Sequence, residues 1–315
     1  MTTMTDVALG CWPTPLHPVP GHPHLLLKRE DLNGLGFGGN KVRALEAIAD
    51  VVRREASEVL VTGGRADSNR AALAAIAARR LGISCHLVLD PSAGHEPTVV
   101  AIARAAGAII ERAPCSGAGA VNARVDDVAE GLRAAGRRCL AVPRAGASPV
   151  AVLGYRALAD ELIEQGGTRP GTEVWLPSGS GTTAAGVCLG LSCAGVHEVK
   201  VVAVSVQKPA DVMRARIEQQ VVEAAGVARR PELAAAAMRC LEVAERPAPG
   251  SGALGELAAT GVLPDPVFGL PTWQALAERL GRADDGVPRV LVASGGLPGA
   301  LEALDRTPEM REDGA

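Results

Sequence analysis

The sequence predicts an α/β protein with mostly parallel, twisted sheets and helices on both faces. Short apolar runs typical of strands alternate along the chain with Ala- and Arg-rich stretches of helical period, as in strand–helix–strand units. Hydrophobic residues make up 47% of the 315 residues, which excludes a disordered chain, yet only 2% are aromatic. The core must therefore be built mainly from Ala, Val and Leu.

The expected elements follow one another in a regular order. Five prolines between residues 11 and 25 exclude a helix and predict an extended arm. Residues 25–31 read as a strand, 34–41 as a glycine-rich loop and 41–55 as a helix. A long Pro- and Gly-rich passage, 228–272, is expected to form a loop system, because a strand and a helix still follow it. Further strands are expected at 58–64, 85–90, 108–113, 139–144, 173–180, 200–206 and 289–296.

Length, charge and cysteine usage narrow the class of protein. A chain of 315 residues suits two domains or one large α/β unit. The net charge is −3 and no stretch combines Lys and Arg with aromatic residues, so no nucleic-acid partner is expected. The uncharged run 175–196 contains Pro177 and several glycines, which favours a buried strand, loop and helix over a membrane span. Seven scattered cysteines and an N-terminus without a basic signal predict a cytoplasmic protein without disulfides or a metal site.

Three glycine-rich turns follow strand-like runs, at the sheet edge where open parallel sheets bind ligands. They span 63–69, 177–186 and 293–299. In GSGTT (179–183) the glycines permit close approach of the backbone, and N–H groups at the start of the next helix suit a phosphate. The following strand lacks the acidic residue that binds a dinucleotide ribose. A smaller phosphorylated cofactor is therefore favoured over the nicotinamide cofactor of an oxidoreductase.

A lysine supplies the second chemical signal. Only four lysines stand against 28 arginines, and Lys41 lies in the glycine loop GFGGNK. An amine that can lose its proton is suited to a Schiff base with pyridoxal phosphate, whereas an arginine is not. Lys28, in LLLKRED, is the competing candidate.

Taken together, these motifs resemble a known family. KRED, GFGGNK, GGRADSN, LGYRALADEL, SGSGTT, DPVF and SGGLPG recur in this order over nearly the whole chain. They resemble the fold-type-II pyridoxal-phosphate enzymes, with their tryptophan synthase β-like fold, and specifically the group of 1-aminocyclopropane-1-carboxylate deaminase, D-cysteine desulfhydrase and L-cysteate sulfo-lyase. The resemblance implies pyridoxal 5'-phosphate as cofactor, a small amino acid as substrate and a homodimer. It also implies a smaller Rossmann-like domain at 45–150, inserted into a larger cofactor-binding domain formed by 1–44 and 151–315.

The resemblance assigns roles to individual residues. Lys41 would carry the cofactor as a Schiff base and act as a base on the substrate Cα. Asn69 would bond the 3'-oxygen of the cofactor, Ser68 would lie near the substrate carboxylate and take part in proton transfer, and both would contact substrate. Ser294 would face the pyridine nitrogen. The phosphate would lie on the loop of Gly179, Ser180, Gly181, Thr182 and Thr183.

Several positions depart from the family pattern. Phe268 stands where the family has an active-site tyrosine, and it is still expected to line the substrate site. Gly269 replaces the glutamate that pairs with the pyridine nitrogen in the deaminase, and Ala293 and Ala44 replace a histidine and a basic residue. A second active-site tyrosine, expected some twenty residues upstream of Phe268, has no counterpart. The sole tyrosine, Tyr155, is expected to pack beneath the cofactor rather than to react.

These departures favour one kind of reaction. A hydroxyl at the pyridine nitrogen leaves the ring largely neutral, which favours expulsion of a β-substituent over prolonged carbanion chemistry. We therefore expect β-elimination of the D-cysteine desulfhydrase type, releasing pyruvate and ammonia, or β-replacement. The alternatives are an activity of the 1-aminocyclopropane-1-carboxylate deaminase type and a non-catalytic homologue with the same fold.

Overall fold

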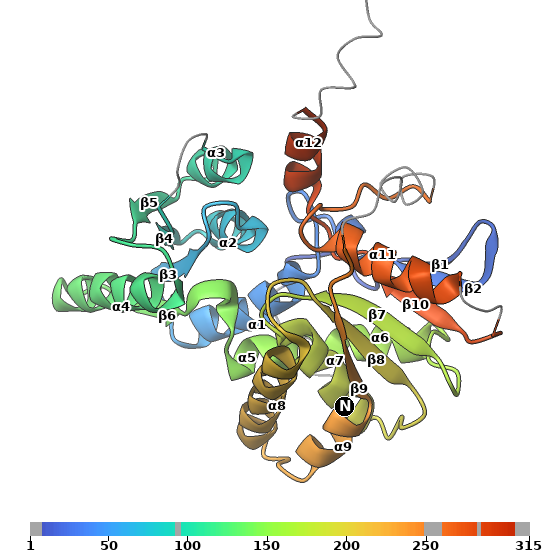
Figure 1. The fold of residues 1–315 in the computed structure, drawn as a ribbon. Coiled ribbons are helices and arrows are strands. Elements are labelled where there is room, and N and C mark those ends of the chain that lie inside the picture. Colours follow the sequence, from blue (N-terminus) through green and yellow to red (C-terminus); the bar gives the residue numbers. More distant parts are fainter. Residues whose placement is uncertain (1–7, 92–95, 249–259, 282–284, 306–315) are drawn as a thin grey trace, which may run out of the picture.

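The computed structural model describes residues 8–91, 96–248, 260–281 and 285–305, which form two sheets with helices packed on both (Figure 1). In chain order the elements are β1 (Leu16–Val19), β2 (His22–Lys28), η1 (Glu30–Leu32), α1 (Lys41–Arg54), β3 (Val59–Gly64), α2 (Asn69–Arg80), β4 (Ser84–Leu89), α3 (Thr98–Ala105), β5 (Ile109–Arg112), α4 (Ala118–Ala134), β6 (Cys139–Val142), η2 (Arg144–Gly146), α5 (Pro149–Gly154), α6 (Arg156–Glu164), β7 (Glu173–Ser178), α7 (Thr182–Cys193), β8 (Lys200–Ser205), α8 (Ala210–Val227), α9 (Leu233–Arg239), β9 (Leu241–Glu245), α11 (Gly269–Leu280), β10 (Arg289–Val292) and α12 (Leu297–Asp305). This order alternates strands and helices over most of the chain, as expected for parallel sheets.

The smaller sheet has the strand order β5-β4-β3-β6, and all of its strand pairs are parallel. Side chains of a strand point alternately to its two faces, so the buried run of β3 serves two cores. Val59 and Val61 pack against α4, whereas Leu60 packs among residues of α1 and α2. α2 and α3 thus cover one face of this sheet and α4 covers the other (Figure 1).

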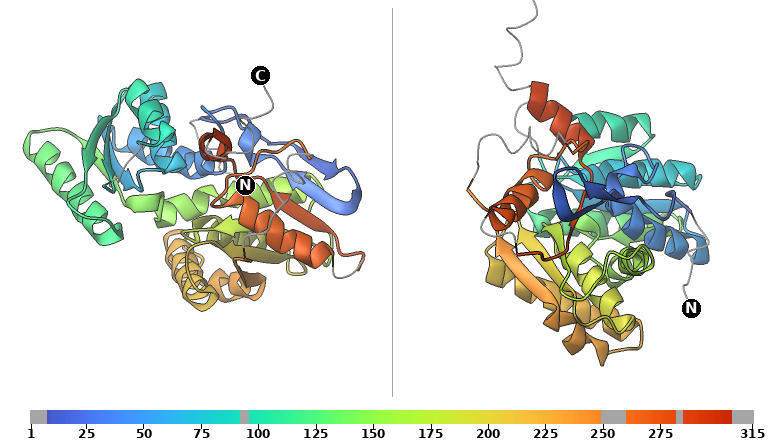
Figure 2. Two further views of the ribbon diagram at one scale, coloured as in Figure 1. Left: turned by 45° about the horizontal axis from the view of Figure 1, so that its top comes forward. Right: turned by 90° about the vertical axis from the view of Figure 1, so that its right-hand side faces the viewer.

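The larger sheet has the order β1-β2-β10-β7-β8-β9. β1 and β2 pair antiparallel, and the other pairs are parallel. Val201 and Ala203 of β8 face α7 and α8, whereas Val202 and Val204 face Trp273 of α11. Figure 2 shows this unit beside the smaller sheet from two further directions.

The predicted fold class is confirmed: both sheets are wholly or mostly parallel and carry helices on both faces. The four strands of the smaller sheet lie between Val59 and Val142, and the larger sheet takes its strands from both sides of that stretch. The domain boundaries near residues 45 and 150 stay a prediction. The run 175–196 forms the buried β7, a turn and α7, and in the described ranges no helix is both long and apolar enough to cross a membrane.

The predicted arm at 11–25 is extended, but it pairs as β1 and the start of β2. Pro18 lies in β1, the edge strand, where a missing N–H is tolerated, and Pro23 lies in β2. One expectation about local structure was wrong. The predicted loop system at 228–272 begins with α9 and β9, and β9 pairs with β8 through Leu241 and Val243. Residues 249–259 of that passage lie outside the described part of the chain.

A buried cluster of four charged residues fixes the start of α1 against the larger sheet. Lys28, Glu30 and Arg43 are each no more than 2% exposed, and Glu161 of α6 is 8% exposed. Arg43 donates to Glu30 at 2.6 and 2.7 Å and to Glu161 at 2.8 and 2.9 Å. Lys28 Nζ lies 2.5 Å from Glu161 Oε2. Paired and bidentate geometry of this kind offsets the cost of burying the charges, so it holds α1 in one position.

Candidate active site

Lys41 is the first residue of α1 and follows the glycine loop, as the sequence predicts. Its Nζ donates to the side-chain oxygen of Asn40 at 2.9 Å. The amide nitrogen of Asn40 donates in turn to Thr183 Oγ1 at 3.1 Å, in the predicted phosphate loop. One short hydrogen-bonded chain therefore connects the lysine to a segment more than 140 residues away.

The structure distinguishes the two candidate lysines by their partners. Lys28 is fully buried, and its Nζ donates to Glu161 Oε2, the carbonyl of Thr14 and Gln165 Oε1 at 2.5 to 2.8 Å. Burial lowers the pKa of Lys28, the ion pair with Glu161 opposes that effect, and the three acceptors occupy the amine. Lys41 is half-buried, and its hydrogen-bond acceptor among the described residues is the neutral amide of Asn40. Lys41 is therefore the amine that can react.

The pKa of Lys41 is suited to that reaction. Burial, together with the positive charge of Arg70, lowers this pKa to about 8, although the carboxylates of Asp265 and Glu30 partly oppose both effects. With a pKa near 8, a fraction of the Lys41 amine is neutral at physiological pH. Only this neutral form is a nucleophile.

The predicted phosphate loop joins β7 to α7 and is shaped by its glycines. Gly181 has φ +88°, a conformation that side chains rarely adopt, and a Cβ there would lie 2.8 Å from Ile217. Helix α8 holds this loop in place through two hydrogen bonds. Gln220 Nε2 and Arg216 Nε donate to the carbonyl of Ser180 at 2.7 and 3.0 Å. Thr182 Oγ1 donates to Gln220 Oε1 at 2.8 Å. The loop is thus preformed, with the N-terminus of the 12-residue α7 at its end.

Ser68 and Asn69 lie at the start of α2, at the carboxyl end of β3. Ser68 is the N-cap, and its Oγ accepts from the backbone N–H of Ala71 at 3.3 Å, which leaves its own O–H free to donate. Asn69 Nδ2 makes a long contact of 3.4 Å with Asp265 Oδ2, and its buried Oδ1 has no hydrogen-bond partner among the described residues.

Two further segments approach these residues from the larger sheet. The carbonyl of Ser294 accepts from the backbone N–H of Asn40 at 3.1 Å, which brings the loop after β10 against the lysine loop. Phe268 packs on the phosphate loop, because a Cβ at Gly179 would lie 2.7 Å from its ring. The structure therefore brings the predicted site residues together around the carboxyl ends of β3, β7 and β10.

Tyr155 lies beneath this site, as expected. It is 2% exposed, and its hydroxyl hydrogen-bonds with Thr183. Burial raises the pKa of Tyr155 to about 12, so the phenol stays neutral. It packs against Gly186 of α7 and supports the phosphate loop rather than facing substrate.

Sequence reasoning missed four residues of the site. Asn40 precedes Lys41 in GFGGNK, and Asp265 begins DPVF, the motif that ends at Phe268. Asp265 accepts from the backbone N–H groups of Val267 and Phe268 at 2.7 and 2.9 Å and so shapes the DPVF turn. Gln220 and Arg216 lie on α8, where a helical pattern gives no sign of contact with a loop 40 residues earlier.

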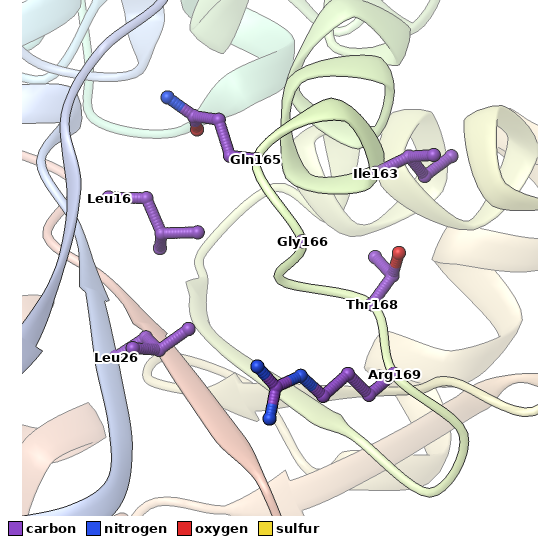
Figure 3. Close-up of a pocket in the computed structure, with 7 residues that line it drawn as sticks. All are labelled: Leu16, Leu26, Ile163, Gln165, Gly166, Thr168 and Arg169. Atoms are coloured by element: carbon purple, nitrogen blue, oxygen red, sulfur yellow. The ribbon is translucent and has the colours of Figure 1, made fainter.

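A surface hollow elsewhere in the molecule has no part in this site. It has a volume of about 460 Å³ and is lined by Leu16 and Leu26 of the first two strands and by the end of α6 and the turn after it (Figure 3). None of the predicted site residues lines it.

Three features of the site fit pyridoxal phosphate. Gly179 and Gly181 form a cradle in which a Cβ would clash, next to free N–H groups for a phosphate. Asn69 offers a buried amide whose contact with protein is long, in reach of a ring substituent. Lys41 offers an amine of lowered pKa. Phosphate, ring oxygen and aldehyde carbon of the cofactor each have a suitable partner.

Comparison with known proteins decides the family. Residues 7–284 match the family described as "Pyridoxal-phosphate dependent enzyme". The chain belongs to this family. Its cofactor is pyridoxal 5'-phosphate, and the prediction of a fold-type-II enzyme is confirmed.

Several relatives of the chain carry names from the deaminase and desulfhydrase group that the motifs resemble. The chain is 31% identical over 249 residues to a "Putative 1-aminocyclopropane-1-carboxylate deaminase" of Pyrococcus horikoshii, covering 72% of each protein. It is 29% identical over 292 residues to a "D-cysteine desulfhydrase" of Yersinia enterocolitica, covering 87% of each. It is 35% identical over 215 residues to a "Nocardicin C-9' epimerase" of Nocardia uniformis, covering 62% of each. A solved structure titled as that of "the ACC deaminase homologue" superposes with a TM-score of 0.84 at 25% identity, over 96% of this chain and 95% of that one.

Proposed function

We propose that the protein is a pyridoxal-phosphate-dependent lyase that removes a β-substituent from a small amino acid, with release of pyruvate and ammonia or capture by a second nucleophile. The relatives named D-cysteine desulfhydrase support this class of reaction. The observation that carries the choice is Phe268, whose ring packs on the phosphate loop and brings no hydroxyl to the site.

In this proposal the residues divide the work. The bound cofactor supplies an electron sink for the pair left at Cα. Lys41, once its amine is free, removes the Cα proton, and Ser68 and the first N–H groups of α2 orient the substrate carboxylate. Asn69 holds the ring oxygen, and Ser294 offers a hydroxyl to the pyridine nitrogen. Gly179, Ser180, Gly181, Thr182 and Thr183 hold the phosphate.

Two measurements test the cofactor site and the reaction separately. The purified protein should show the visible absorption of lysine-bound cofactor, and Lys41→Ala should lose it while Lys28→Met, if folded, should keep it. Formation of 2-oxo acid should then be assayed with D-cysteine, L-cysteate, β-chloroalanine and 1-aminocyclopropane-1-carboxylate. Turnover of the last compound alone would refute β-elimination.

A deaminase of the 1-aminocyclopropane-1-carboxylate type is the second candidate, supported by the relatives that carry that name. The same assay separates it from a lyase. Exchange of the substrate Cα proton in D₂O without 2-oxo acid would instead indicate epimerisation, the reaction in the name of the Nocardia relative. A protein that binds cofactor but does none of these would be a non-catalytic homologue.

We also propose that the chain works as a cytoplasmic homodimer with a smaller domain at 45–150. The seven cysteines are all free, which suits a reducing compartment. Leu297 and Leu301 of α12 are 39% and 52% exposed, and such apolar surface suits a contact between subunits. Light scattering of the purified protein gives its mass directly, and a monomer at micromolar concentration would refute the dimer.

A further inference from the structure

The phosphate loop at 179–183 has no charged side chain of its own. Its residues are glycine, serine and threonine, and the first turn of α7 adds no acidic or basic residue. A phosphate monoester, such as that of pyridoxal 5'-phosphate, carries a charge of about −1.5 to −2 at pH 7. Backbone N–H groups would have to balance this charge alone, unless a cation lies close to the loop.

Arg216 of α8 is such a cation. Its Nε donates to the carbonyl of Ser180 at 3.0 Å, so the guanidinium is attached to the backbone of the loop. Its two terminal nitrogens make no hydrogen bond or ion pair with the described residues. Arg124 and Arg138, at the surface, instead bind a carboxylate through a terminal nitrogen. Arg216 therefore keeps both a charge and N–H groups for an anion at the loop.

The contact with Ser180 also fixes the direction of the next N–H group. The C=O and N–H of a trans peptide point in opposite directions, so a Ser180 carbonyl that faces α8 turns the N–H of Gly181 away from α8. This N–H has no acceptor among the described residues. Gln220 Nε2 donates to the same carbonyl at 2.7 Å. Two donors on one carbonyl polarise the peptide and strengthen its N–H as a donor to an anion.

We propose that Arg216 makes the site selective for a phosphorylated ligand. It supplies the positive charge that the loop lacks, and it orients the Ser180–Gly181 peptide so that the N–H of Gly181 is available to the phosphate. The inference rests on the proposed cofactor site and names the residue of α8 that gives the site its charge. Of the two α8 side chains that hydrogen-bond to the loop, Gln220 is neutral and Arg216 is charged.

The test compares two ligands that differ only in the phosphate. Full-length protein freed of cofactor is titrated with pyridoxamine 5'-phosphate and, separately, with pyridoxamine, and isothermal titration calorimetry gives both dissociation constants. Neither ligand has an aldehyde, so neither bonds to Lys41. Arg216→Met and Arg216→Gln should weaken binding of pyridoxamine 5'-phosphate about tenfold, the effect of removing one charge close to a phosphate, and leave pyridoxamine binding unchanged. Arg216→Lys keeps a positive charge and should restore most of the affinity.

Arg214→Met is the matched control. Arg214 lies on the same helix, and its Nη1 donates to the carbonyl of Leu241 at 3.0 Å, so this variant removes the same charge and the same kind of hydrogen bond away from the loop. It should bind both ligands as the wild type does, and a loss equal to that of Arg216→Met would overturn the proposal.

Two results for Arg216 itself would also overturn it. One is an unchanged affinity for pyridoxamine 5'-phosphate in both Arg216→Met and Arg216→Gln. The other is an equal loss of affinity for pyridoxamine, which would mean that Arg216 shapes the loop without recognising the phosphate. Because neither ligand bonds to Lys41, these results are distinct from a failure of Lys41→Ala to lose the visible absorption, which would refute the proposed cofactor site instead.

Discussion

Substitution by Met at two buried arginines should change the free energy of unfolding with opposite signs. Arg43 and Arg70 are 2% and 4% exposed, so Met in either place buries a similar apolar volume. Arg43 makes four hydrogen bonds to Glu30 and Glu161, whereas Arg70 makes one, to the hydroxyl of Thr62. Their partners, and not their burial, decide the outcome.

The magnitudes follow from those partners. Arg43→Met leaves two buried carboxylates with Lys28 as their remaining cation, and removing one member of a buried ion pair costs about 3–5 kcal/mol. Burial lowers the pKa of Arg70 to about 10. At about 1.4 kcal/mol for each pKa unit, this is roughly 3 kcal/mol of penalty on the charged form. Arg70→Met removes that penalty and loses one hydrogen bond worth about 1 kcal/mol, so it should gain roughly 2 kcal/mol.

Urea unfolding of the cofactor-free proteins at pH 7, followed by circular dichroism, measures both changes. The midpoint should fall for Arg43→Met and rise for Arg70→Met, with the slope against urea unchanged. A fall of similar size in both variants would refute the reasoning, because it would mean that Arg70 is as well paired as Arg43.

Three further predictions concern the site itself. Gly181→Ala should weaken cofactor binding at least tenfold, since the positive φ costs about 1–2 kcal/mol and its Cβ would meet Ile217; Gly195→Ala, with φ +72° and open space around it, is the matched control in a fluorescence titration. In the cofactor-free protein the pKa of Lys41 is lowered to about 8, against about 10.4 in the unfolded chain, so the unfolded state binds more protons between these values and stability should rise with pH across that window. Lys41→Met should lack this rise in urea titrations from pH 7 to pH 10, and an identical rise would contradict the lowered pKa. Phe268→Tyr should increase 2-oxo acid formation from 1-aminocyclopropane-1-carboxylate relative to β-chloroalanine, and an unchanged ratio would show that the phenol is not what directs the reaction.

Features encoded locally could be predicted from the sequence. The strand expected at 58–64 is β3 at Val59–Gly64, and the one expected at 200–206 is β8 at Lys200–Ser205, because a continuous apolar run bounded by turn residues has few other stable conformations. Lys41 and the loop at 179–183 could also be predicted, from signals of another kind. Glycines with special backbone geometry and a lysine in an arginine-rich chain are local signals.

Features that depend on distant contacts could not be predicted. Asp265 meets Asn69 across 196 residues, and Gln220 reaches Ser180 across 40, so neither contact leaves a local pattern. Arg70 lies in an Ala-rich helical stretch and looks like any of the other arginines until its burial and its missing partners are known. The prolines of 11–25 predict extended backbone but not the pairing of β1 with β2, because they exclude a helix without specifying a partner strand.

The charged cluster beneath α1 also has a bearing on salt. Lys28 and Arg43 contribute two positive charges, and Glu30 and Glu161 contribute two negative ones, so the cluster is electrically neutral as a whole. Dissolved ions screen charges that face water, at distances beyond about 3 Å at 1 M ionic strength, and have little effect on buried paired charges. Molar salt should therefore weaken the exposed ion pairs and leave intact the buried charged cluster that holds the start of α1, where Lys41 lies.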